Sequence, residues 1–299
     1  MKTMKILRPE LSFFVAVAFL LPVAGCSGDG PVLSVTEGTP LIITAEIGAS
    51  ASPTTRAAVA SNTYDRSRFI ASDRINVVCS RNKVQLASSG YTMNATATAW
   101  EVTSGNVGLG FLPATVCRAS FPVAYDGILA DQQATDGSSF LKSNYLLTPE
   151  IPVSGAEVNF TGAYAFKHEN TKLTLKFVGS AGVALPAFTR VTLEAVGLQT
   201  KDNRTETIFP FRPDTDVHTW CAVVYPLAQA GTVITVTVID SYNVTYKTQI
   251  TCPLAKATSY TYTLQVRNDI LVPLGDAEIK DWTLEVRQSG GFDKEEKNN

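Results

Sequence analysis

The chain has 299 residues, a net charge of −2, 17% charged residues and 45% hydrophobic residues. This length suffices for one or two domains with a sizeable core, and the charge balance excludes a broad basic surface for nucleic acid. With two histidines and no cofactor fingerprint, we predict a protein that is not an enzyme and has no catalytic residue, cofactor or metal site. Threonine occurs 34 times, and alternating segments rich in Thr, Val and Tyr are typical of β-strands.

Residues 1–25 have the pattern of a signal peptide. Basic residues precede an apolar run, Leu11 to Ala24, that is too short to span a bilayer. Small residues then lead into Cys26 and a polar linker, a pattern that resembles a bacterial lipobox. The resemblance implies cleavage before Cys26 and a lipid anchor on this residue. The alternative is an ordinary signal peptide with a chance cysteine.

Residues 26–56 are expected to hold a tether and one strand. Within Leu41–Ile47, the side chains of Leu41, Ile43, Ala45 and Ile47 share one face. The following stretch of small residues contains Arg56 and is expected to be an exposed loop. Exposed loops are common sites of proteolysis.

Beyond residue 57 we expect two domains, residues 57–165 and 166–290, and a charged tail at residues 291–299. Strands of the first domain are predicted at residues 74–78, 83–86, 98–102 and 157–161, with an irregular segment at residues 129–144. Strands of the second are predicted at residues 172–178, 189–196, 232–239 and 259–266. Half-buried alternation is typical of antiparallel strands in a sandwich, so the predicted fold is all-β with two tandem β-sandwich domains.

Four cysteines remain after Cys26: Cys79, Cys117, Cys221 and Cys252. An exported chain with four cysteines favours disulfides, and three connectivities are possible. The alternative is that they are small buried thiols. The spacing offers no zinc-binding pattern.

Several stretches follow one another in a recognisable order. The lipobox is followed by a strand and Thr54-Thr55-Arg56-Ala57, and later by Asp65–Val78 and Phe121–Tyr125. Phe166–Thr174 begins with the pattern F-x-H-x-x-T-K-L, and Ile279–Trp282 reads I-x-D-W. In this order and spacing the stretches resemble the fimbrillin family of Bacteroidia, whose members build type V pili.

The resemblance implies transthyretin-like sandwiches with Greek-key antiparallel sheets, and a stalk or tip pilin exported as an outer-membrane lipoprotein. An arginine-specific protease would cut between Arg56 and Ala57. The strand Leu41–Ile47 would then leave, and a strand of another subunit would take its place. The mature protein would be extracellular, in the fimbrium, and would support adhesion. The candidate donor strand is Trp282–Arg287, in which Trp282, Leu284 and Val286 share one face.

Other interpretations stay open. Leu41–Ile47 could be a permanent edge strand, Arg56 an ordinary loop residue and Trp282 a core residue. His168 is most simply a structural residue that bonds to the backbone. The whole chain could instead be a surface-anchored lipoprotein that binds a glycan or a host protein through loops, without polymerising.

Overall fold

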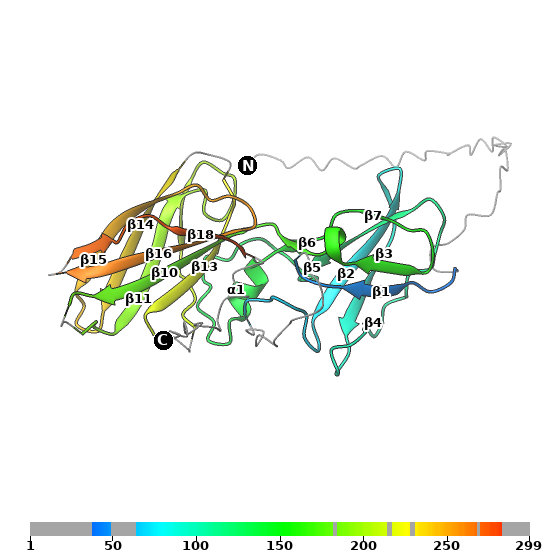
Figure 1. Ribbon diagram of the computed structural model, residues 1–299, viewed down its shortest axis with the longest axis horizontal. Helices are drawn as coiled ribbons and strands as arrows, with labels where there is room; N and C mark the ends of the chain where they lie inside the picture. Colours follow the sequence, from blue (N-terminus) through cyan, green and yellow to red (C-terminus); the bar gives the residue numbers. More distant parts are fainter. Residues whose placement is uncertain are drawn as a thin grey trace, which may run out of the picture. The chain divides into compact units, whose positions relative to one another are not determined.

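The computed structural model describes residues 38–48, 64–181, 184–213, 217–227, 231–267 and 270–282 (Figure 1). All of them lie in one compact unit, Leu33–Asn299; the other unit, Met1–Val32, is outside the described residues. Strands dominate these ranges and form four sheets. The all-β prediction is therefore confirmed.

The first half of the chain builds a seven-stranded sheet in the order β4-β3-β2-β5-β6-β9, with β7 pairing with β5. Its strands are β2 (Arg74–Arg81), β3 (Val84–Met93), β4 (Trp100–Val102), β5 (Val116–Phe121), β6 (Leu146–Leu147), β7 (Ile151–Pro152) and β9 (Lys167–His168). A separate pair joins β1 (Ile42–Ala45) to β8 (Glu157–Phe160). Buried side chains of both sheets and of the segments beside them form one cluster, the N-terminal core, which includes Leu41, Ile43, Phe69, Phe121 and Phe166.

The second half builds two further sheets, seen together in Figure 1. One sheet contains β10 (Thr171–Gly179), β13 (Thr219–Val224), β16 (Thr258–Arg267), β17 (Ile270–Pro273) and β18 (Glu278–Asp281). The other contains β11 (Phe188–Val196), β12 (Thr205–Ile208), β14 (Thr232–Asp240) and β15 (Thr245–Cys252). Side chains of both sheets are buried together in the C-terminal core, which includes Leu175, Val191, Val236, Leu264 and Trp282. Burial alternates along β11 and β14, whereas Thr171–Leu175 of β10 and Trp220–Val224 of β13 are buried at every position.

Two pairings differ from the antiparallel expectation. β1 runs parallel to β8, and β10 runs parallel to β16. Between β10 and β16 the chain enters the other sheet twice, as β11–β12 and as β14–β15, and returns once as β13, which runs antiparallel to β10. Sequence alternation records which face of a strand is buried but not the direction of its neighbour, and it therefore did not reveal these pairs.

The segment at residues 129–144, expected to be irregular, contains a short helix, α1 (Ser138–Ser143). The side chains of Ile128 and Phe140 belong to the C-terminal core. Gln132 also reaches this half, because its amide exchanges two hydrogen bonds of 2.8 and 2.9 Å with the backbone of Val223. The predicted first domain includes Ile128, Gln132 and Phe140, whereas their side chains contact the second half.

Candidate functional site

The N-terminal strand β1 is held by backbone hydrogen bonds along its whole length. Its register with β8 runs from Ile42 opposite Glu157 to Ala45 opposite Phe160. Just before β1, the Leu41 N–H donates to the Leu109 carbonyl at 2.8 Å. Just after it, the Phe166 N–H donates to the Glu46 carbonyl at 3.0 Å. Backbone bonds of this kind can be made by any residue except proline.

The side chains of this segment alternate between the core and solvent, as the sequence predicts. Leu41, Ile43 and Ile47 are 6%, 4% and 5% exposed and belong to the N-terminal core. Ala45 is half-buried against the same core, whereas Ile42 is 62% exposed. Burying a large aliphatic side chain contributes about 1.5–3 kcal/mol. Three such side chains therefore hold the segment firmly, through contacts that require only apolar groups.

Glu46 adds a side-chain contact that sequence reasoning missed. Its Oε1 accepts a hydrogen bond of 2.7 Å from the backbone N–H of Gly162. Gly162 opens a 3₁₀ turn, Gly162–Tyr164, with a φ of 57°, a conformation that favours glycine. The carboxylate thus satisfies a donor at a tight turn beside the end of β1. The sequence carries no signal for this contact, because Glu46 lies on the face opposite Leu41, Ile43, Ala45 and Ile47, where a charged side chain is expected to meet solvent.

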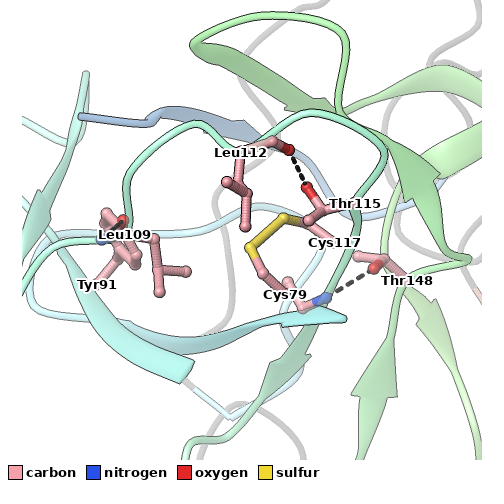
Figure 2. Close-up of a disulfide and its surroundings, with 8 residues drawn as sticks. Cys79, Tyr91, Leu109, Leu112, Thr115, Cys117 and Thr148 are labelled. Carbon is pink, nitrogen blue, oxygen red and sulfur yellow. Dashed lines mark hydrogen bonds between the residues drawn. A yellow bond between two sulfur atoms is a disulfide. The ribbon is translucent and has the colours of Figure 1, made fainter. Parts of the chain in front are cut away.

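A disulfide lies in the same core as Leu41, Ile43 and Ile47. Figure 2 shows it between Cys79 of β2 and Cys117 of β5, which are register partners on neighbouring strands. Cys221 and Cys252 are buried thiols, and burial raises the pKa of the Cys252 thiol. Of the connectivities that the sequence left open, the structure contains the Cys79–Cys117 pair.

At the other end of the described chain, Trp282 is fully buried, and a polar cluster surrounds it. Its indole N–H donates to Asp65 Oδ1 at 3.0 Å. The other oxygen of Asp65 accepts from Lys172 Nζ at 2.7 Å. The ring of His168 stacks on the indole with centroids 4.0 Å apart and planes 5° apart. We call Asp65, Lys172, His168 and Trp282 the Asp65 cluster.

Burial and charge together set the protonation states in the Asp65 cluster. Burial raises the pKa of Asp65, but the Lys172 ammonium and the nearby His168, with hydrogen bonds from Lys172 and Trp282, leave that pKa below its ordinary value. Burial lowers the pKa of His168 to about 4. The carboxylates of Asp65 and Asp281 act to raise this pKa, and the Lys172 charge acts to lower it further. His168 is therefore neutral at neutral pH. Its Nδ1 lies 2.8 Å from Asn144 Oδ1, a side-chain partner in place of the expected backbone bond.

Several predicted site residues lie outside the described residues. They are Cys26, Arg56, Ala57, Leu284 and Val286. Across the described ranges, no three His, Cys, Asp or Glu side chains are grouped to hold a metal ion. No helix within those ranges has the length and apolar character needed to cross a membrane.

Comparisons with known proteins identify relatives of this architecture. A family model described as fimbrillin-like matches residues 130–282, just over half of the chain. A candidate cell adhesion protein from Bacteroides ovatus has a similar structure, with a TM-score of 0.60 and 18% identity over 82% of this chain and 98% of that one. Another from Bacteroides uniformis has a TM-score of 0.58 and 14% identity over the same shares. No curated protein matches the sequence.

Proposed function

Because the chain belongs to the fimbrillin-like family, we propose that it is a structural subunit of a pilus that supports adhesion. Its partners are other pilin subunits, and it acts as a building block with no chemistry of its own. The observation that carries the proposal is the attachment of β1. Backbone bonds and three aliphatic side chains hold this strand, and another alternating strand can supply the same contacts.

We propose that the precursor is an outer-membrane lipoprotein anchored through Cys26. Arg56 lies between the last described residue after β1, Gly48, and the next described residue, Tyr64. A cut between Arg56 and Ala57 by an arginine-specific protease would leave β1 attached by non-covalent contacts alone. The remaining product, Ala57 to Asn299, has 243 residues.

Loss of β1 would uncover the N-terminal core and the edge of β8. An uncovered edge of this kind is a template for another strand. A strand of another subunit that enters the groove makes a head-to-tail contact, and such contacts build open filaments. The segment that follows Trp282 is the candidate donor. The assembled form is extracellular, in the fimbrium.

Limited digestion of residues 27–299 with an arginine-specific protease tests this function. We expect one early cut after Arg56, seen by intact mass, followed by loss of residues 27–56 and growth of oligomers on gel filtration. Arg56→Ala blocks both changes, whereas Arg68→Ala, the matched control at an exposed arginine, leaves them intact. A cut that leaves a monomer with β1 in place would contradict the proposal and favour an anchored binding protein.

A further inference from the structure

The Cys79–Cys117 disulfide joins two central strands of the seven-stranded sheet. β2 lies between β3 and β5, and β5 in turn pairs with β6 and β7. Cys79 and Cys117 are 1% and 0% exposed, and they belong to the N-terminal core together with Leu41, Ile43 and Ile47. The disulfide therefore lies inside the core that β1 helps to fill.

The N-terminal segment also holds the stretch of chain that leads into β5. The Phe111 N–H donates to the Thr39 carbonyl at 2.7 Å, and the Leu41 N–H donates to the Leu109 carbonyl at 2.8 Å. Cys117 follows Phe111 by six residues. Loss of residues 27–56 would remove these hydrogen bonds and three buried aliphatic side chains at the same time.

Two side-chain hydrogen bonds near the disulfide do not involve residues 27–56 (Figure 2). The Leu109 N–H donates to the Tyr91 hydroxyl at 3.2 Å, and the Thr115 hydroxyl donates to the Leu112 carbonyl at 2.7 Å. Each bond contributes only about 1 kcal/mol. The disulfide differs from them, because it joins β2 to β5 covalently whether or not the core around it is filled.

A disulfide stabilises a fold mainly by restricting the unfolded chain, and more so for a longer loop. Cys79 and Cys117 are 38 residues apart, so the bond should shift the unfolding equilibrium roughly 10²–10³-fold toward the folded state. The factor is the same with and without β1. Its consequence differs, because the form without β1 has lost buried apolar side chains and has less stability to spare.

We infer that the Cys79–Cys117 disulfide keeps the first half of the chain folded while β1 is absent, so that strand exchange requires the oxidised protein. This inference rests on the proposed function, since it concerns the form from which β1 has left. In the uncut chain β1 completes the core, and the fold survives without the disulfide. After loss of β1 the fold depends on the disulfide, and a thiol reductant gains access to its sulfur atoms.

Removal of the disulfide tests the inference against a matched variant. Residues 27–299 carrying Cys79→Ala/Cys117→Ala are compared with wild type and with Cys221→Ala/Cys252→Ala, which removes the two buried free cysteines. Hydrogen exchange of β2 and β5 is measured before cleavage, and again after cleavage and removal of fragment 27–56 by gel filtration. We expect all three uncut chains to protect these strands.

After removal of the fragment, the variants should separate. Protection of β2 and β5 should be at least a hundredfold lower in Cys79→Ala/Cys117→Ala than in the other two proteins, and it alone should fail to take up fresh fragment 27–56. Equal protection and equal uptake in all three would overturn the inference and leave the proposed function standing.

Reduction of the wild type is a second measurement that needs no substitution, and it decides the matter if the disulfide variant does not fold. At one concentration of dithiothreitol, peptide mapping after alkylation should show Cys79 and Cys117 reduced at least tenfold faster once the fragment is gone. The reduced chain should then lose fragment uptake and regain it on reoxidation. Uptake that is unchanged by reduction would overturn the inference alone. A fragment that leaves the cut wild type only when the whole protein unfolds would contradict the proposed function, and the inference with it.

Discussion

The two ends of the described chain are fastened in different ways. At β1, three aliphatic side chains, one carboxylate and a row of backbone hydrogen bonds hold the segment. At Trp282, the attachment depends on an indole donor, a buried carboxylate and a buried ammonium that match one another in position and charge. Generic contacts can be supplied by another strand, whereas a matched buried network cannot.

This difference supports the proposal that β1 is the exchanged segment and that Trp282 stays in its own subunit. A buried ion pair contributes little net stability compared with apolar packing, but removing one partner is strongly destabilising. The Asp65 cluster thus makes departure of Trp282 costly. Under the proposed function, departure of β1 would expose apolar surface and backbone groups that a similar strand could cover again.

Substitution of Asp65 should have the largest effect. Asp65→Asn removes the charge that faces Lys172 in a buried site, so we expect the free energy of unfolding in urea to fall by about 3–5 kcal/mol. Adding Lys172→Met should recover much of this loss. Asp126→Asn, at an exposed aspartate, is the control and should change stability by less than about 0.5 kcal/mol. A small effect of Asp65→Asn would remove the argument for a fixed Trp282.

Shortening a buried side chain of β1 should have the next largest effect on stability. Ile43 is 4% exposed, and Ile43→Ala should destabilise the uncleaved chain by about 2–4 kcal/mol. Ile42→Ala, at the neighbouring position that is 62% exposed, should have little effect. After cleavage and strand release, Ile43→Ala should no longer matter, because the residue has left. An effect that persists in the released product would mean that β1 stays bound.

Lowering the pH should reduce the free energy of unfolding, because His168 of the Asp65 cluster becomes protonated on unfolding. The pKa of His168 in the folded chain is about 4, below its ordinary value of 6.5. Between these two pH values the imidazole is protonated in the unfolded chain and neutral in the folded chain. Stability should therefore fall as the pH drops from about 6.5 to 4, by about 2–3 kcal/mol. Urea unfolding of wild type and His168→Gln across this range measures the slope. Equal slopes for the two proteins would exclude His168 as the source.

The smallest effect is expected at Glu46. Glu46→Ala leaves the Gly162 N–H without its side-chain acceptor and should cost about 1 kcal/mol. The rate at which residues 27–56 leave after cleavage should rise accordingly, by roughly fivefold. Glu157→Ala, at an exposed position of β8, is the matched control. An unchanged release rate for Glu46→Ala would show that this contact does not retain the strand.

Local patterns in the sequence were enough to predict about half of the strands, whereas β5, β12, β13, β15 and β17 were not predicted. Alternation in Leu41–Ile47 identified the buried face of β1, and the same reasoning located β10 and β16 to within a few residues. The helix α1 was not predicted, because its six residues form less than two turns and carry no apolar stripe. The parallel pairing of β10 with β16 was not predicted, because the alternation of apolar and polar residues does not depend on the direction of the neighbouring strand.

The two candidate sites depend on contacts between distant residues. His168, Lys172 and Trp282 each occur in sequence patterns that resemble a family, yet nothing local places Asp65 between them. The contact from Asp65 to Trp282 spans 217 positions. The Cys79–Cys117 pair likewise required the adjacency of β2 and β5. The domain division at residue 165, the cleavage at Arg56 and the lipid on Cys26 remain predictions.

Exchange of the cleaved strand tests the central contrast most directly. Residues 27–299 are cut after Arg56 and mixed with an excess of isotopically labelled fragment 27–56, and intact mass follows its uptake in native buffer. We expect the labelled fragment to replace the original one, while the tryptophan fluorescence of the remaining chain stays that of the folded protein. Uptake only at urea concentrations that unfold the whole protein would contradict it.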